Sequence, residues 1–327
     1  MSEIVSIAQT PTDRLLHSDS RDHRVDAMFH FAVKSCAIVV LIALAGAAAS
    51  MLYGGREAFS TFGWKFLWSS DWDPVTKQFG ALVPVYGTLV TAFLAMLLAV
   101  PVSFGIALFL TEISPLWLRT PTATAIDLLA GIPSIIYGMW GLFVFVPYMS
   151  KHIDPWLIDH FGKLPIIGML FSGPPMGLGM LTAGIVLAVM VIPFITAVMR
   201  EVFTTVPTPL KESAYALGST NWEVVWHVVL PYTRSAVTGG IFLGLGRALG
   251  ETMAVTFVLG NTHRLSASLL EPGNSIAAAI ANEFTEADSS LYLSSLIALG
   301  FLLFVVTFVV LAIARLMLRR MARMAGN

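Results

Sequence analysis

Six apolar runs, four of them free of charged residues, alternate with polar segments along the chain of 327 residues. A helix needs roughly 20 apolar residues to cross the hydrocarbon core of a bilayer, and each run approaches or exceeds that length. We therefore expect an all-α polytopic membrane protein with six transmembrane helices, at about 35–53, 81–110, 122–149, 181–199, 236–259 and 291–314.

For two segments, the pattern does not decide between a membrane span and another structure. The second run is long and contains prolines, so it is either one tilted, kinked span or a span followed by an interfacial piece. The segment Ile166–Met180 is apolar but short, and Gly173, Pro174 and Pro175 interrupt it. Because unpaired backbone at membrane depth must be shielded, we expect a re-entrant or outer-surface hairpin here and no seventh helix.

Composition agrees with a membrane environment. The mean hydropathy is +0.79 and charged residues make up 12% of the chain, about half the share of a soluble domain. The net charge is -1 and the basic residues are dispersed, which excludes nucleic acid as a partner. The seven histidines show no metal-ligand spacing, and no nucleophile motif is present, so neither a metal site nor an enzyme is indicated.

The distribution of lysine and arginine predicts the orientation. With the N-terminus inside, 12 of the 19 basic residues fall on the cytoplasmic side, 6 fall outside, and Arg247 lies within a span. This bias favours both termini in the cytoplasm. The predicted organisation is a cytoplasmic tail over 1–34, a transmembrane domain over 35–314 and a second tail over 315–327. The aromatic-rich segment Phe59–Trp72 is then an outer loop at the membrane interface.

A polar segment between the fourth and fifth runs predicts two short helices joined by a turn. Thr208 is placed to cap the first helix, with Pro209 at its first position, and Gly218 supplies a left-handed stop. Thr220 and Glu223 have the spacing of a capping box for the second helix.

Pro231 is expected to end that second helix. An interfacial linker is the plain interpretation of such a segment. A DNA-binding helix-turn-helix is excluded because the segment has almost no cationic residues for phosphate contacts.

The residues of this segment resemble a known motif. Glu212, Ala214, Gly218, Leu230 and Pro231 match the loop of ABC importer permeases, with consensus E-A-A, three residues, G, nine residues, I, one residue, L-P. Ser213 and Val228 are the departures from it. The resemblance implies a type I importer permease whose cytoplasmic loop, 200–235, docks on an ATPase. The residues we expect on the docking surface are Ala214, Leu217, Trp222, Val225 and Trp226.

Longer blocks, from Gly80, Gly131, Leu170 and Gly239, resemble the C-type permeases of bacterial phosphate (Pst) importers. The resemblance implies a second permease (PstA-like), a dimeric cytoplasmic ATPase (PstB-like) and a periplasmic phosphate-binding protein (PstS-like). It also places ATP and Mg on the ATPase, and the chain indeed lacks a G-x-x-x-x-G-K-[ST] motif. Permeases for sulfate, molybdate or phosphonate share the coupling loop and remain alternatives. A self-contained ion-coupled carrier is another, although no inverted repeat is evident.

Two charged residues within the fifth run point to an anion pathway. Arg247 lies 11 residues into the run, about 17 Å deep at 1.5 Å per residue, where an arginine normally faces a protein interior or a wet cavity. Its guanidinium matches two oxygens of an oxyanion. Glu251, four residues on, is expected on the same helix face, neutralising Arg247. A purely structural ion pair is the alternative.

Three further features of the sequence carry expectations. Gly244, Gly246 and Gly250 favour close helix packing, with a widened pathway as the alternative. Asp127 is expected in the first turn of the third span, where the helix dipole favours a carboxylate. The acidic loop Gly260–Ser290 is expected to be solvated, with docking of an external binding protein as the alternative.

Overall fold

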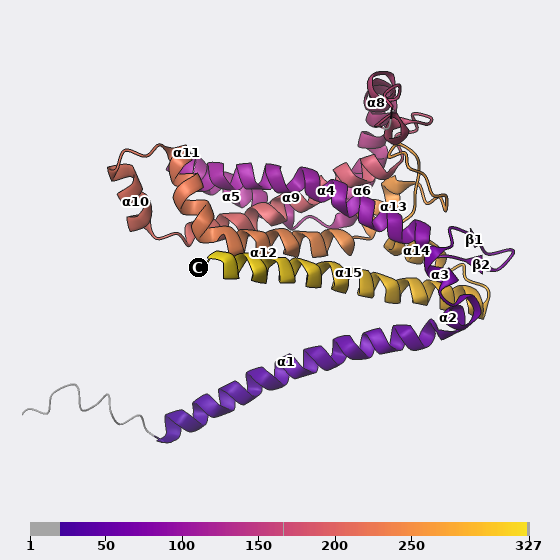
Figure 1. Ribbon diagram of the computed structural model, residues 1–327, viewed down its shortest axis with the longest axis horizontal. Coiled ribbons are helices and arrows are strands. Elements are labelled where there is room, and N and C mark those ends of the chain that lie inside the picture. The colour runs from indigo at the N-terminus through magenta and orange to yellow at the C-terminus, as the bar shows by residue number, and fades with distance from the viewer. Residues whose placement is uncertain (1–19, 166, 326–327) are drawn as a thin grey trace, which may run out of the picture. The chain divides into compact units, whose positions relative to one another are not determined.

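The structure is a computed structural model that describes residues 20–165 and 167–325 (Figure 1). The chain divides into two units, Met1–Ser50 and Met51–Asn327. The first unit contains most of helix α1 (Ser20–Gly54), which begins well before the predicted start of the first span. Its stretch Val25–Gly54 is long and apolar enough to cross a membrane. Residues 1–19 of the predicted tail lie outside the described residues.

Four further long helices in the second unit meet the same criterion, and a bent helix pair brings the number of candidate spans to as many as six. The four spans are Leu82–Ile113, Met180–Thr204, Asn221–Leu249 and Ser290–Met317. They correspond to α4 (Leu82–Leu108) with the π turn η2 (Phe109–Ile113), α9 (Met180–Thr204), α11 (Asn221–Val224) with η6 (Val225–Val229) and α12 (Leu230–Leu249), and α15 (Ser290–Ala325). The second apolar run is therefore one continuous span.

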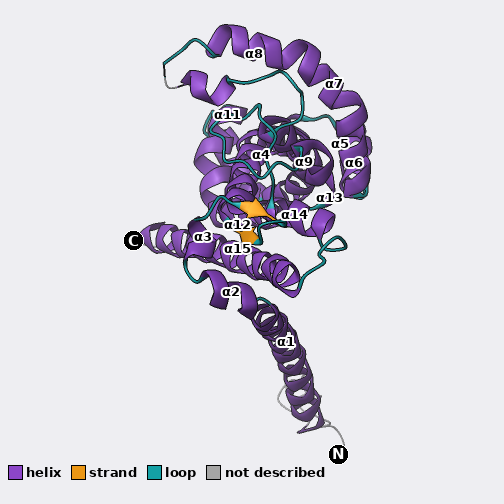
Figure 2. Ribbon diagram, turned by 90° about the vertical axis from the view of Figure 1, so that its right-hand side faces the viewer, coloured by secondary structure: helices purple, strands orange, loops and turns teal. Residues whose placement is uncertain are grey.

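Small side chains allow α4 and α9 to pack closely at the centre of this unit (Figure 2). Ala92, Ala95 and Ala99 of α4 are almost fully buried. At Gly184 of α9, a Cβ would lie 2.8 Å from Cβ of Leu94, so a larger residue would force the helices apart. Such small-residue contacts are typical of helices in lipid, where dispersion contacts replace the hydrophobic effect as the main attraction.

The third predicted span is not a single straight helix. Helix α5 (Leu116–Ala130) and the helical series Ser134–Phe161 meet at an angle of 89°. That series comprises α6 (Ser134–Trp140), η3 (Gly141–Phe145), α7 (Val146–Tyr148), η4 (Met149–Ile153) and α8 (Asp154–Phe161), with α8 projecting from the bundle (Figures 1 and 2). Pro133 explains the break, because it lacks an amide donor and disfavours a helical conformation for the residue before it.

Because of this break, Asp127 does not lie where the sequence predicted it. It lies in the last turn of α5, not in the first turn of a span, so the helix dipole does not favour its carboxylate. Instead, Arg200 Nη2 lies 3.2 Å from its Oδ2. The predicted place of Asp127 was wrong because the helix runs from Leu116 and stops just after it.

The acidic outer loop is largely a packed element. Helix α14 (Ile276–Glu283) is capped by Ser275, whose Oγ accepts from the Ala278 amide at 3.1 Å. Ile276 and Ala278 are fully buried, and the backbone enters beside Gly87 of α4, where a Cβ would collide with the Asn274 carbonyl. The expectation of a solvated loop was therefore wrong for α14, since its alanine-rich face packs against α4 and α15.

The aromatic loop after α1 is also partly core. It forms α2 (Arg56–Phe62), α3 (Lys65–Trp68) and a hairpin of β1 (Trp72–Asp73) and β2 (Gln78–Phe79). Phe66 and Phe79 are buried, whereas Trp64 and Trp68 are 82% and 75% exposed. The buried phenylalanines form a second core with α15, and the interfacial position of the exposed tryptophans stays a prediction.

The segment before α9 forms no long helix. Its only regular element is a 3-10 turn, η5 (Ile167–Phe171), and Ile166 lies outside the described residues. Backbone groups pair with a neighbouring loop and with α8: the Leu269 amide donates to the Leu170 carbonyl at 2.9 Å, and the Gly177 amide donates to Asp154 Oδ2, at the start of α8, at 2.8 Å. The remaining elements of the unit are α10 (Thr208–Ala216) and α13 (Met253–Leu259).

Candidate functional site

The polar segment between the fourth and fifth spans folds as two helical pieces and a turn. Helix α10 ends at Ala216, and Gly218 adopts φ +89, the left-handed conformation that glycine tolerates. The capping box of α11 is present: the Thr220 amide donates to Glu223 Oε2 at 2.8 Å, and the Glu223 amide donates to Thr220 Oγ1 at 3.4 Å. These local predictions are confirmed.

Two predicted helix boundaries in this segment were wrong. Thr208 makes no side-chain cap; it is the first residue of α10, and Pro209 is the second. Pro231 does not end the second helix, because the π turn η6 changes the hydrogen-bond register just before it and Pro231 enters the first turn of α12. The helix therefore continues from Asn221 to Leu249. At 1.5 Å per residue, about 39 Å of continuous helix joins Asn221 to Arg247.

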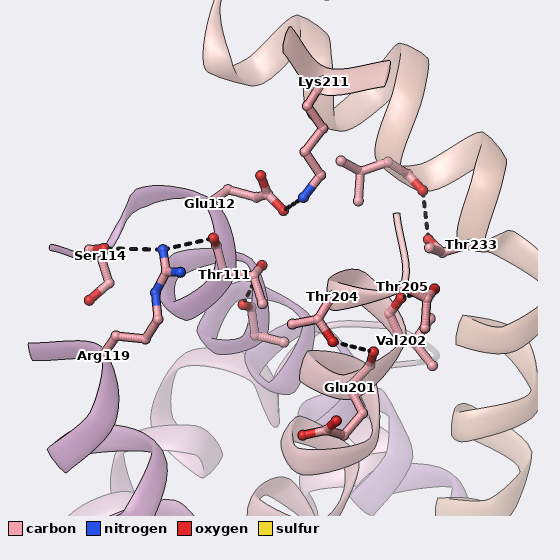
Figure 3. Close-up of polar contacts among 12 residues, drawn as sticks. Thr111, Glu112, Ser114, Arg119, Glu201, Val202, Thr204, Thr205, Lys211 and Thr233 are labelled. Carbon is pink, nitrogen blue, oxygen red and sulfur yellow. Dashed lines mark hydrogen bonds and ion pairs between the residues drawn. The ribbon is translucent and has the colours of Figure 1, made fainter. Parts of the chain in front are cut away.

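A buried ion pair attaches α10 to the end of α4 and η2. Lys211 Nζ donates to Glu112 Oε1 at 2.6 Å, with side-chain exposures of 16% and 6% (Figure 3). Burial raises the pKa of Tyr215 on α10, and the negative charge of Glu112 raises it further. Next to this pair, Arg119 Nη2 donates to the Thr111 carbonyl at 2.9 Å, so α5 is fixed to the same end of the bundle.

The sequence did not indicate this anchor. Glu112 and Lys211 are separated by 99 positions, and neither belongs to a local motif that predicts the other. The weak signal available was a lone carboxylate directly after a long apolar run.

Part of the predicted docking surface is exposed. Leu217 is 88% exposed, Trp222 66% and Trp226 49%, and the two indole rings meet edge to face at 5.4 Å. Glu212 and Pro231 are also exposed, whereas Ala214 and Leu230 are half-buried against the core. Val225 was wrongly predicted: it is only 6% exposed because its side of the helix faces that core.

Arg247 lines a cavity of about 550 Å³ bordered by α9, α12 and α15. Its Cζ lies 5.2 Å from the ring centroid of Phe194, a cation–π contact. No carboxylate in the described part of the chain forms an ion pair with Arg247. The side chain is exposed to this cavity rather than sealed in a core.

Glu251 does not share a helix face with Arg247. Helix α12 ends at Leu249, and Glu251 lies in the break before α13, where its Oε1 accepts from the Ala254 amide at 3.3 Å. The predicted i, i+4 pair was wrong because α12 ends at Leu249, two residues before Glu251, with Gly250 at its C-cap. Gly244, in contrast, shows the expected packing role, since a Cβ there would lie 2.7 Å from Ile195 of α9.

A hydrogen-bonded cluster around Glu283, missed from the sequence, lies at the end of the unit opposite α10 (Figure 1). The Glu283 carboxylate accepts from Trp72 Nε1 at 2.7 Å and from the Tyr292 hydroxyl at 2.6 Å, and it contacts His263 Nε2 at 2.7 Å. Burial alone would raise the pKa of Glu283, but the hydrogen bonds from His263, Tyr292 and Trp72 outweigh it and hold the pKa below its ordinary value.

No group of three His, Cys, Asp or Glu side chains is placed to hold a metal ion within residues 20–165 and 167–325. The α10–α11 end and the Arg247 cavity differ in their chemistry. The α10–α11 end exposes large apolar side chains, a surface typical of protein interfaces, and the cavity at Arg247 contains a guanidinium, a group whose chemistry suits an anion.

The comparisons agree with this arrangement of spans around a polar connecting segment. Residues 99–323 match the family described as binding-protein-dependent transport system inner membrane component, and the chain belongs to that family. It is thus a multi-pass inner-membrane protein. Members of this family are permease subunits, which are the non-catalytic transmembrane part of a transporter.

Relatives with a more specific name cover nearly the whole chain. "Phosphate transport system permease protein PstC" of Xylella fastidiosa (strain 9a5c) is 66% identical over 309 residues, 94% of this chain and 95% of that protein. The protein of the same name from Pasteurella multocida is 58% identical and covers 98% of both chains. A "probable" PstC of Methanocaldococcus jannaschii is 39% identical over 78% of this chain and 80% of its own length.

Two solved structures show the same fold at low sequence identity. One is a chain of the MetNI methionine ABC transporter in an inward-facing conformation, with a TM-score of 0.53 and 16% identity, covering 76% of this chain and 96% of that one. The other belongs to a bacterial ABC transporter that imports the acidic polysaccharide alginate, with a TM-score of 0.52, 18% identity and coverages of 94% and 99%.

Proposed function

We propose that this chain is a translocation subunit of an ABC importer for inorganic phosphate. The observation that carries the proposal is the set of relatives named phosphate permeases, 53–66% identical over more than nine-tenths of the chain. The partners in this proposal are a second, PstA-like permease, a dimeric ATPase that binds ATP and Mg, and a periplasmic phosphate-binding protein.

Uptake of labelled phosphate tests this function. A bacterium lacking its own high-affinity phosphate importer is supplied with this chain and its three partner proteins, and uptake is measured at micromolar phosphate. We expect uptake that unlabelled phosphate suppresses and sulfate does not. If sulfate or molybdate competes as well as phosphate, the transporter is not selective for phosphate and this proposal is wrong.

The α10–α11 surface is the proposed attachment point for the ATPase. Leu217 and Trp222 are strongly exposed, and large exposed apolar groups are typical of protein interfaces. The Lys211–Glu112 pair ties α10 to α4, and the continuous helix from Asn221 to Leu249 leads to Arg247. A displacement of the docked surface would therefore move two spans together.

Arg247 is the proposed phosphate contact, because it is an intramembrane cation that faces a cavity and lacks an acidic partner in the described chain. Glu251 belongs to the same pathway in this proposal: its charge at the break between α12 and α13 limits how tightly an anion is held nearby. Uptake by Arg247→Lys and Glu251→Gln, with ATPase attachment checked by pull-down, tests both roles. Normal uptake by both variants would remove them from the pathway.

A further inference from the structure

The cavity that contains Arg247 has a second basic residue on its wall. The side chains that border it come from α9, α12 and α15, and three of the α15 residues, Thr307, Leu311 and Arg315, are spaced at i, i+4 and i+8. Residues at this spacing lie on one face of a helix, so they form a stripe along the cavity. Arg315 was assigned from the sequence only to the start of the C-terminal tail.

The contacts between α12 and α15 set the order of these groups along the bundle. A Cβ at Gly246 would lie 3.6 Å from Leu311, so Arg247 is close to the level of Leu311. Arg315 is four residues further along α15, about 6 Å nearer the end that carries α10. If the termini are cytoplasmic, as the distribution of basic residues predicts, Arg315 is on the inner side of Arg247.

Both guanidinium groups lack a counter-charge within the described residues. Every ion pair between described side chains involves other residues, and the charged groups bordering the cavity are these two arginines alone. Two unpaired cations in a partly apolar cavity repel each other, and the repulsion is relieved when an anion lies between them. A doubly charged oxyanion such as hydrogen phosphate matches two forked donors in charge and in geometry.

We propose that Arg315 is a second phosphate-binding residue, which receives the ion from Arg247 on its way to the cytoplasm. Thr307, on the other side of Leu311, adds a hydroxyl to the outer part of the same wall. The inference rests on the proposed function, because it takes phosphate as the cargo, but it concerns a residue that the proposal does not otherwise require.

Uptake kinetics of Arg315→Gln and Arg315→Lys in the complete transporter test the proposal. Loss of one charge-assisted contact is expected to raise the phosphate concentration for half-maximal uptake or to lower the maximal rate roughly 10-fold in the glutamine variant. The lysine variant keeps the charge without the fork and should fall between that variant and wild type. Arg234→Gln, an exposed arginine of α12 that does not border the cavity, is the matched control and should transport normally.

A labelling experiment separates a phosphate site from a lipid site. Cys36 is the only cysteine of the chain, so Cys36→Ser/Thr307→Cys places a single thiol in the cavity. Inorganic phosphate should slow labelling of this thiol in the reconstituted complex, and Arg315→Gln should abolish that protection. If the labelling rate instead follows the content of anionic lipid in the vesicle and ignores phosphate, Arg315 binds a headgroup and the proposal is wrong.

The outcomes also separate this inference from the proposed function. A wild-type complex that imports no phosphate contradicts the function. A wild-type complex that imports phosphate, together with Arg315→Gln kinetics and thiol protection equal to wild type, contradicts the role of Arg315 alone.

Discussion

Replacing Lys211 by methionine removes the cation that partners a buried carboxylate. The pair has an Nζ–Oε1 distance of 2.6 Å, and Glu112 is 6% exposed. Removing one partner of a buried pair costs about 3–5 kcal/mol, because the other charge stays buried and uncompensated. Since Lys211 is 16% exposed and admits some solvent, we take the lower end, about 3 kcal/mol.

This free-energy cost is expected to weaken the attachment of α10 rather than the whole fold, because the pair joins α10 to the end of α4. A change of about 3 kcal/mol lowers the protection of the α10 amides roughly a hundredfold in hydrogen exchange, if α10 opens locally. Helix α9, whose core contacts are unchanged, is the internal control. In the full transporter, phosphate uptake per ATP hydrolysed should fall, because the attached ATPase then moves α10 without moving α4.

The double variant decides whether the charge is responsible. Glu112→Gln/Lys211→Met leaves no buried unpaired charge. The α10 amides should therefore regain most of the hydrogen-exchange protection that Lys211→Met removes. If the two single changes are additive, or if Lys211→Met leaves exchange and uptake unchanged, the pair does not anchor α10 and the reasoning is refuted.

Two further predictions concern the ends of the bundle. Leu217→Asp and Trp222→Ala should each abolish pull-down of the ATPase while leaving the amount of permease in the membrane unchanged, whereas Arg234→Gln should leave pull-down intact; binding that survives both changes would place the interface elsewhere. For Glu283, the folded-state pKa lies below the ordinary value of 4.5, so its contribution to stability is complete above about pH 4.5 and is lost as the pH falls through the folded pKa. Thermal unfolding in detergent should show an acid-dependent component that Glu283→Gln removes, and equal acid sensitivity of the two proteins would contradict this.

Features that depend on neighbouring residues were predictable from the sequence. The capping box needs only Thr220 and Glu223, three positions apart, and the left-handed turn needs only a glycine at 218. The long spans follow from hydropathy, and the family motif identified the segment that holds Glu212 and Gly218. The cytoplasmic position of the termini remains a prediction.

Features that depend on distant residues were not predictable. Glu283 looked like one of several solvated acids, and its partner Trp72 is 211 positions away. The break between α12 and α13 separates Arg247 from Glu251, and hydropathy alone does not register it because both sides are apolar. Val225 was misplaced because it was assigned to the surface by residue type alone, whereas its burial comes from the main core, which includes residues far away in the sequence.

The central claim is that phosphate crosses the membrane through this chain only when a separate ATPase is bound to the α10–α11 end. Proteoliposomes that contain the chain and its partner permease, assembled with or without the ATPase and supplied with the binding protein, ATP and labelled phosphate, test it directly. We expect phosphate uptake that requires the ATPase and stops with Leu217→Asp. Uptake of phosphate by the permeases alone, or full uptake by the Leu217→Asp transporter, would contradict it.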